Sequence, residues 1–180
     1  MKLQLRRSNQ NDLDKVHELQ SQCFDTSDQM YRSNLQHYLN DGILLEDIGA
    51  NKLIGVLLQG FITPCNNDIK LTLDEPDTGT NNNIIKVDIN KCNEFDFYKE
   101  HYGIVMLCVD SEYRKHGYAQ KLIEKHFNDN NVSSCLNTRK TNINAIELYK
   151  KMGYEHIAYI KDNYFFPNAD STFMIKEKTI

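Results

Sequence analysis

The chain has 180 residues, which is long enough to bury the core of one domain and short for two. Hydrophobic residues make up 40% and charged residues 26%, as in an ordinary soluble globular protein, and the net charge of −4 gives no electrostatic reason to expect a nucleic-acid partner. No apolar run approaches the roughly 18 residues of a membrane span, and the N-terminal segment lacks the apolar stretch of a signal peptide, so a cytoplasmic protein without membrane contact is expected.

The first part of the chain predicts two helices followed by two strands. Apolar residues recur with helical spacing over 9–24, where Asn9 offers a cap, and again over 29–39, before the stop signal Asn-Asp-Gly. The segments 42–48 and 53–62 are apolar, and the residues between them suit a tight turn. These two segments therefore predict an antiparallel strand pair.

The segment 64–100 differs in character from the rest of the chain. It is rich in asparagine and holds two of the three prolines, which predicts an exposed insertion between strands. Two short apolar pieces inside it, IKLTL and IIKVDI, suggest a small hairpin.

The second half alternates strands and helices. The continuous apolar run HYGIVMLCV predicts a central strand, and a helical pattern follows from Ala119 to about Asn128. SSCLNT predicts a short strand, NINAIELYKKM a helix closed by Gly153, and YEHIAYI and STFMIKE two more strands separated by the loop KDNYFFPNAD. This order is typical of an α/β protein, with a mixed central sheet flanked by helices in a single domain over 1–180.

The five cysteines and six histidines predict no metal site. The cysteines stand at positions 23, 65, 92, 108 and 135, an odd number at wide spacing, which indicates neither a disulfide framework nor a zinc site. Cys108 and Cys135 lie inside apolar runs, so buried packing is expected for both. No pair of histidines has ligand spacing.

The segment YRKHGYA stands where the predicted central strand turns into a helix. It places Arg114, Gly117 and Ala119 in the pattern R-x-x-G-x-A. The first amides of a helix have no intrahelical partner and lie at the positive end of its dipole, so an anion such as a phosphate can bind there. Gly117 would let the backbone approach closely, although a turn that merely caps the helix would show the same pattern.

A second block, TRKTNINAIELYKKMGY, carries the pattern N-x-x-A-x-x-L-Y-x-x-x-G-Y from Asn142 through Tyr149 to Gly153. With both blocks in this order the sequence resembles the GNAT superfamily of N-acetyltransferases, over most of the chain apart from 64–100. The resemblance implies the GNAT fold and acetyl-CoA as co-substrate. The strand 104–109 would bind pantetheine, and adjacent parallel strands around Leu107 and Leu136 would splay to admit it. The cofactor-binding residues that it implies are Leu107, Cys108, Val109, Arg114, Lys115, His116, Gly117, Tyr118, Ala119, Asn142 and Tyr149.

A closer resemblance is to protein N-terminal acetyltransferases, including ribosomal-protein alanine acetyltransferases. It rests on CFDTSDQMY, RKTNINAIELYKKMGY and DNYFFPNADSTFMIK. It implies that protein or peptide N-termini are the substrates, with an auxiliary subunit or the ribosome as a further partner. Phe24, Tyr164 and Phe165 would wall the substrate channel beside Asp28, unless these aromatic residues simply pack the edge of the sheet.

The acetyl-transfer reaction asks for two bound reactants, an oxyanion donor, an acid and a base. The resemblance implies Tyr149 as the acid that protonates the leaving thiolate, and a backbone amide near Val109 as the oxyanion donor. Asn137 stands where relatives carry a histidine or glutamate base, and an amide takes up no proton at neutral pH. Gly103 replaces a tyrosine used by other relatives. The base is therefore sought among His101, Tyr102 and an acid of the first loop such as Asp28, acting directly or through water.

Two other functions fit the same motifs. One is a GNAT that acetylates a small-molecule amine or a lysine side chain, and the other is a non-catalytic subunit that binds CoA. An α-amine with a pKa near 8 is roughly a tenth neutral at pH 7, which costs about 1.4 kcal/mol, whereas a lysine near 10.4 costs about 4.6 kcal/mol. A weak base therefore suffices for an N-terminal substrate, and the residue at Asn137 favours that substrate or a non-catalytic role.

Overall fold

The computed structural model describes residues 1–63, 70–73, 84–87, 96, 100–130, 132–164 and 169–177. These residues form two compact units. Unit 1 comprises Met1–Gly60 and Ile104–Val132, and unit 2 comprises Phe61–Gly103 and Ser133–Ile180. Most of the insertion expected at 64–100 lies outside the described residues, so the expectation of one domain that carries this insertion stays a prediction.

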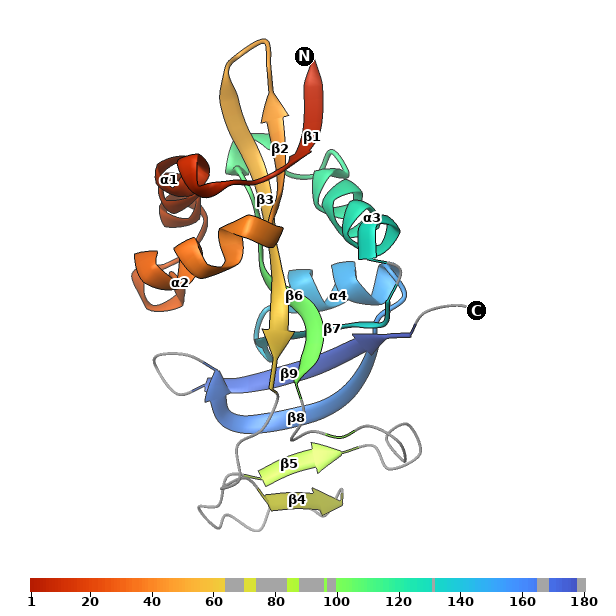
Figure 1. Cartoon of the computed structure of the whole chain (residues 1–180). Helices are drawn as coiled ribbons and strands as arrows, with labels where there is room; N and C mark the ends of the chain where they lie inside the picture. The colour runs from red at the N-terminus through yellow and green to blue at the C-terminus, as the bar shows by residue number, and fades with distance from the viewer. Residues whose placement is uncertain are drawn as a thin grey trace. The chain divides into compact units, whose positions relative to one another are not determined.

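Unit 1 contains four strands in the order β1-β2-β3-β6, of which β1 and β2, and β2 and β3, pair antiparallel. Helices α1 and α2 lie on one side of β2 and β3, and α3 lies on the other (Figure 1). The elements are β1 (Leu3–Arg7), η1 (Gln10–Asp12), α1 (Leu13–Cys23), η2 (Thr26–Asp28), α2 (Arg32–Tyr38), η3 (Leu39–Asp41), β2 (Ile43–Asp47), β3 (Lys52–Ile62), β6 (His101–Val109), η4 (Ser111–Tyr113) and α3 (Tyr118–Asn130). The ends of β3 and β6 extend into unit 2.

The elements predicted for unit 1 are confirmed, and their local causes are visible. Asn9 caps the first helical turn, because its side chain accepts a hydrogen bond from the amide of Asn11 at 2.9 Å and Asp12 bonds back to its amide. The turn between β2 and β3 contains Asn51 at φ 49°, a left-handed conformation that asparagine tolerates better than most residues. Both predicted helices and the predicted strand pair therefore form.

The packing of the core of unit 1 explains why the sequences of its central strands are continuously apolar. Leu58 of β3 and Met106 of β6 pack with Val16 of α1 and Leu35 of α2 on one face. Leu122 of α3 approaches β3 from the other face, where a Cβ added to Gly55 would lie 3.1 Å from its Cδ1 atom. Because helices cover both faces, successive residues of β3 are buried.

Unit 2 contains a strand series in the order β7-β9-β8-β5-β4 and one helix. β9 pairs antiparallel with β7 and with β8, and β5 pairs antiparallel with β8. A small core of Cys135, Ile157, Ala158, Ile160 and Phe173 holds these strands together. The elements are β4 (Lys70–Leu73), β5 (Ile84–Val87), β7 (Ser134–Arg139), α4 (Ile143–Lys151), β8 (Glu155–Tyr164) and β9 (Ala169–Lys176).

Two sequence-based expectations for unit 2 are wrong. The pieces expected to form a hairpin, β4 and β5, pair parallel, with Lys70 opposite Ile84. Ten residues separate β4 from β5, and a chain of that length can return to the start of a four-residue strand, which a tight turn cannot do. The expected loop 161–170 is also shorter, because β8 continues to Tyr164, which pairs with Ala169 of β9. The polar sequence of this part of β8 concealed its strand conformation.

Candidate active site

The segment between β6 and α3 bends sharply just before the first turn of α3. Lys115 has φ 65° and Gly117 has φ 79°, so two residues within three positions adopt the left-handed conformation. The amide of Lys121 donates to the carbonyl of Gly117 at 3.1 Å, which is the first α-helical bond of α3. The amides of residues 118–120 precede that bond and have no partner four residues back. Such a turn at a helix N-terminus is suited to bind an anion.

Cationic side chains surround this turn. Arg114, Lys115 and His116 are all exposed. The ring of His116 stacks on the ring of Tyr118 at a centroid distance of 5.7 Å, and Lys121 Nζ lies 5.6 Å from the same ring centroid. This combination of bent backbone and positive charge complements a diphosphate group.

Two residues that the sequence analysis missed, Asp110 and Lys52, hold the segment before this turn in place. The carboxylate of Asp110 caps η4 by accepting a hydrogen bond from the amide of Glu112 at 2.9 Å. Lys52 Nζ lies 2.8 Å from Asp110 Oδ2, 3.2 Å from Glu112 Oε2 and 5.2 Å from the ring centroid of Tyr113. Burial raises the pKa of Asp110, but the bond from Lys52 and the amide of Glu112 outweigh it and hold that pKa below its usual value.

Of these two residues, the sequence alone indicates the role of Asp110 but not that of Lys52. An aspartate directly after a strand and directly before a helical turn is a recognisable cap, so Asp110 was detectable in the sequence. Lys52 lies far from Asp110 in the chain, and only the folded β2–β3 pair brings it close. Arg114 adds a further support, since its Nε donates to the carbonyl of Val109 at 3.0 Å.

The α4 region carries the second motif of the sequence analysis, from Asn142 to Gly153. Asn142 caps α4, because its side chain accepts a hydrogen bond from the amide of Ala145 at 3.3 Å. Gly153, at φ 86°, ends the helix as predicted. Tyr149 is 7% exposed and its ring meets the ring of Tyr154 edge-on at 5.5 Å. Tyr149 is thus held in a fixed orientation by packing.

Tyr154 extends this packing to β7. Its hydroxyl lies 3.0 Å from the hydroxyl of Ser134. Burial raises the pKa of Tyr154, and the bond with Ser134 only partly opposes that effect. Tyr154 therefore stays protonated and supports Tyr149 as a neutral neighbour.

The side chains of Asn137 on β7 and Ser171 on β9 lie on the same face of the sheet. Asn137 is opposite Phe173, which is two residues from Ser171, so both polar side chains point to the same side of the strand pair. Asn137 Oδ1 and Ser171 Oγ are buried and have no hydrogen-bond partner among the described residues. Buried polar atoms of this kind normally bond to water or to a ligand.

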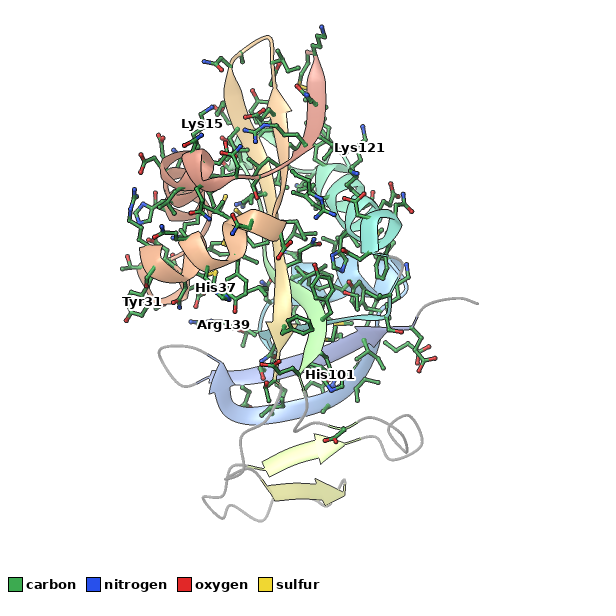
Figure 2. All side chains as sticks on the ribbon, in the orientation of Figure 1. Lys15, Tyr31, His37, His101, Lys121 and Arg139 are labelled. Carbon is green, nitrogen blue, oxygen red and sulfur yellow. The ribbon has the colours of Figure 1, made fainter. Side chains whose placement is uncertain are left out.

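The start of β6 holds two of the candidate bases. His101 (Figure 2) has its Nε2 atom 2.6 Å from the carbonyl oxygen of Asp96. A carbonyl only accepts, so Nε2 carries the hydrogen, and in the neutral ring Nδ1 is the nitrogen that can take up a proton. The ring of Tyr102 meets the ring of Phe61 edge-on at 5.5 Å.

Gly103 has a structural reason to be glycine. A Cβ added there would lie 2.0 Å from the carbonyl oxygen of Cys135. The thiol of Cys135 also bonds to the carbonyls of His101 and Tyr102, at 3.7 and 3.6 Å. The backbones approach so closely that no side chain fits, which excludes the tyrosine base that the family resemblance suggested for this position.

The residues expected to line a substrate channel are found in different settings. Phe24 is the C-cap residue of α1, is half-buried and packs against the core of unit 1. Asp28 is the last residue of η2 and is also half-buried. Tyr164 is the last residue of β8 rather than part of a loop, and Phe165 lies outside the described residues. Their role at a channel stays a prediction.

Among the described residues, no group of three or more histidine, cysteine, aspartate or glutamate side chains is placed to hold a metal ion. No helix in the described part of the chain is long and apolar enough to span a membrane. Cys108 and Cys135 are buried, as expected from the sequence.

Comparison with known proteins agrees with this geometry. Residues 81–156 match a family model described as an acetyltransferase (GNAT) domain, a range that includes the bent turn, Asn142 and Tyr149. No curated protein sequence matches the chain. This part of the chain is therefore similar to an acetyltransferase (GNAT) domain, in agreement with the resemblance stated in the sequence analysis.

Solved structures of N-terminal acetyltransferases share its fold. NAA60 of Arabidopsis thaliana in complex with acetyl-CoA superposes with a TM-score of 0.70 at 19% identity, covering 98% of this chain and 99% of that one. The ribosomal-protein-S18-alanine N-acetyltransferase of Escherichia coli gives 0.68 at 12%, covering 99% and 96%. Naa20 of Chaetomium thermophilum in complex with a bisubstrate analogue gives 0.66 at 21%, covering 97% and 86%. The expected GNAT fold is confirmed.

Proposed function

We propose that this protein is an acetyl-CoA-dependent N-acetyltransferase that acts on the free α-amine of protein or peptide N-termini. The observation that carries the proposal is the bent turn at the start of α3, with Lys115 and Gly117 in left-handed conformations beneath exposed cationic side chains. The GNAT domain match and the fold shared with N-terminal acetyltransferases support it.

The turn would hold the pyrophosphate of acetyl-CoA. The amides at the start of α3 would donate to its oxygens, Arg114 and Lys115 would supply positive charge, and the ring of His116 would contact the cofactor. Leu107, Cys108 and Val109 of β6 would bind the pantetheine through their backbone, and Asn142 would contact the cofactor in addition to capping α4. The bound thioester supplies an activated acetyl group.

In the proposed reaction the α-amine attacks the thioester carbonyl, the new C–N bond forms and the C–S bond breaks. Tyr149 donates its hydroxyl proton to the departing thiolate sulfur. Its burial and its contact with the ring of Tyr154 hold the hydroxyl in one orientation. A backbone amide near Val109 would stabilise the negative charge on the carbonyl oxygen.

We assign His101 as the base in this proposal, with Tyr102 and Asp28 as the alternatives. Its Nε2–H bond to the carbonyl of Asp96 leaves Nδ1 as the proton acceptor. The unpartnered atoms of Asn137 and Ser171 are suited to hold a water that relays the proton. An α-amine needs only such a weak base, since its pKa near 8 leaves about a tenth of it neutral at pH 7.

The remaining site assignments belong to the same proposal. Phe24, Asp28, Tyr164 and Phe165 would contact the first residues of the peptide. An auxiliary subunit or the ribosome would present the substrate, and the cytoplasm is where nascent N-termini appear.

One assay separates this function from its alternatives. The purified protein is incubated with acetyl-CoA and matched peptides whose N-termini are free or formylated, with and without lysine, and released thiol is measured. Turnover that disappears on blocking the α-amine supports the proposal. Turnover that persists on blocked lysine peptides shows a side-chain acetyltransferase instead, and saturable CoA binding without turnover on any amine shows a non-catalytic subunit.

A further inference from the structure

Three polar residues stand at one end of the sheet face that carries the core of unit 2. They are Asn137 and Arg139 of β7 and Ser171 of β9, which lies directly opposite Arg139. Because side chains alternate along a strand, all three point to the same face. That face also carries the apolar side chains of Cys135, Ala158, Ile160 and Phe173.

Two atoms of this group lack the hydrogen bonds that buried polar atoms normally make. Ser171 is 0% exposed, and its Oγ atom has no partner among the described residues. The Oδ1 atom of Asn137 is also buried and has no partner in this part of the chain. The neighbouring side chains of Ile160 and Phe173 offer neither a donor nor an acceptor. Asn137 and Ser171 are diagonal neighbours on paired strands, so one small polar group can bridge the two atoms.

The chemistry of the two atoms selects the kind of group that can bridge them. Asn137 Oδ1 only accepts a hydrogen bond, whereas the hydroxyl of Ser171 can donate one. A hydroxyl group, of water or of a side chain, satisfies both atoms because it donates and accepts. A carboxylate cannot donate to Asn137 Oδ1. An ammonium group would add a second positive charge beside Arg139, the residue opposite Ser171.

We propose that Asn137 and Ser171 form a specificity subsite for a hydroxyl on the first residue of the substrate, so that N-termini beginning with serine or threonine are preferred. The inference rests on the proposed function, in which a water at these two atoms relays the proton of the reacting amine. A substrate group that takes the place of this water must belong to the residue that carries the amine. Serine and threonine carry their hydroxyl on the β-carbon of that residue.

Threonine and valine have nearly the same shape, so a comparison of the two isolates the contribution of the hydroxyl. A site that hydrogen-bonds a substrate hydroxyl discriminates against an analogue without it, because the buried groups of the site are then left unpaired. An apolar site would discriminate between the two only weakly. We therefore expect kcat/KM to be at least about tenfold higher for a peptide that begins with threonine than for one that begins with valine.

The test compares peptides that are identical beyond the first residue and have free N-termini. The ratio of kcat/KM for threonine to that for valine is measured with acetyl-CoA and the full chain, and serine and alanine provide a second pair. In Ser171→Ala the ratio should fall to within about twofold of unity. Asn137→Leu should lower it in the same way and replaces Ser171→Ala if that variant is not folded by circular dichroism.

Thr172→Val is the matched control. Thr172 is 1% exposed, and its Oγ1 atom is also buried without a partner among the described residues. It follows Ser171 directly in β9, so its side chain points to the other face of the sheet. The ratio for threonine and valine peptides should therefore be the same in Thr172→Val as in the unmodified protein.

The possible outcomes separate this inference from the proposed function. Peptides that begin with threonine and valine and are acetylated equally well would overturn the subsite and leave the proposed function intact. A preference for threonine that survives both Ser171→Ala and Asn137→Leu would also overturn it. If no peptide is acetylated, the proposed function fails, and calorimetric titration of the same peptides into the protein saturated with CoA decides the inference. Binding at least about tenfold tighter for threonine supports the subsite, and equal or undetectable binding overturns it.

Discussion

At the scale of single residues, Gly103 shows how a backbone contact decides which side chains a site can use. Its α-hydrogen faces the carbonyl of Cys135, and an added Cβ would lie 2.0 Å from that oxygen. The atom in the way belongs to the backbone, so it cannot move aside as the end of a side chain would. A base of the proposed site must therefore lie elsewhere, and His101 and Tyr102 are the candidates on the same strand.

Gly103→Ala should destabilise the protein. The two backbones must separate to admit the methyl group, and overpacking of this kind costs on the order of 2 kcal/mol or more. Urea unfolding followed by circular dichroism measures the change. Gly49→Ala is the matched control, since Gly49 is exposed and its added Cβ would meet only the side chain of Asp47, at 3.3 Å. Equal stability of the two variants would contradict the close approach of Gly103 and Cys135.

Tyr149→Phe should lower kcat by about a hundredfold or more, with little change in the affinity for CoA. The change removes the proton donor proposed for the thiolate and keeps the ring that packs on Tyr154. Steady-state kinetics with a free N-terminal peptide and CoA titration by calorimetry measure the two quantities. Tyr154→Phe is the control, because it removes the bond to Ser134, costs about 1 kcal/mol of stability and should leave kcat nearly intact. An unchanged kcat in Tyr149→Phe would remove this residue from the acid role.

Residue patterns predicted the functional residues that lie close together in the chain and missed those that meet only through folding. Arg114, Gly117 and Tyr149 could be singled out because each sits in a short motif with a local physical reason. Lys52 and the contact of Gly103 with Cys135 depend on pairings between distant segments, for which a single sequence carries no signal.

At the scale of elements, the turn before α3 depends on the strand pair β2–β3. Lys52, the first residue of β3, contacts Asp110, Glu112 and Tyr113, which span the whole of η4. The bonds to Asp110 and Glu112 raise the pKa of Lys52, so it remains charged at any working pH. One half-buried lysine thus ties the segment that enters the turn to a rigid strand, although it would not touch the cofactor.

Lys52→Met should weaken CoA binding by a few-fold, because the segment 110–113 loses its anchor and the turn must be ordered on binding. The apolar stem is retained, so packing on Tyr113 changes little. Calorimetric titration with CoA measures the effect, and Lys52→Arg should restore most of the affinity. Lys15→Met is the control, since Lys15 (Figure 2) is an exposed lysine of α1 whose partner is Glu46. Equal affinities in Lys52→Met and Lys15→Met would rule out an anchoring role.

The errors in predicted elements have a common cause. A short apolar segment predicts a strand but does not identify the strand that it pairs with. β4 and β5 were therefore expected to form an antiparallel hairpin, whereas they pair parallel. The end of β8 is polar in sequence, and its pairing with β9 makes it a strand. The existence and order of most elements followed from periodicity, but β1 was not predicted, and the strand partners could not be derived from the sequence.

At the scale of the whole molecule, we expect the decrease in the free energy of unfolding at acidic pH to depend on one histidine in α3. His126 is 1% exposed, and its Nδ1 atom lies 2.5 Å from Gln59 Oε1, which also accepts a bond from Asn130 Nδ2 at 3.1 Å. Burial, with a smaller contribution from the charge of Arg7, lowers its pKa to about 4, and the nearby Asp129 opposes this only weakly. The histidine is therefore buried in its neutral form.

The sign of the pH dependence follows from this lowered pKa. Between pH 6.5 and about 4 the unfolded chain binds a proton at this position that the folded chain does not, so stability is complete above pH 6.5 and falls as the pH decreases. The full difference amounts to about 3 kcal/mol. Urea unfolding at a series of pH values should show that the free energy of unfolding falls as the pH decreases. His126→Gln, which keeps a donor for Gln59, should reduce the slope of this dependence by the equivalent of about one bound proton. His116→Gln alters an exposed histidine and should leave the slope unchanged. If His126→Gln retains the full slope, the acid sensitivity arises at other groups, and α3 is not the element that begins to unfold through this protonation.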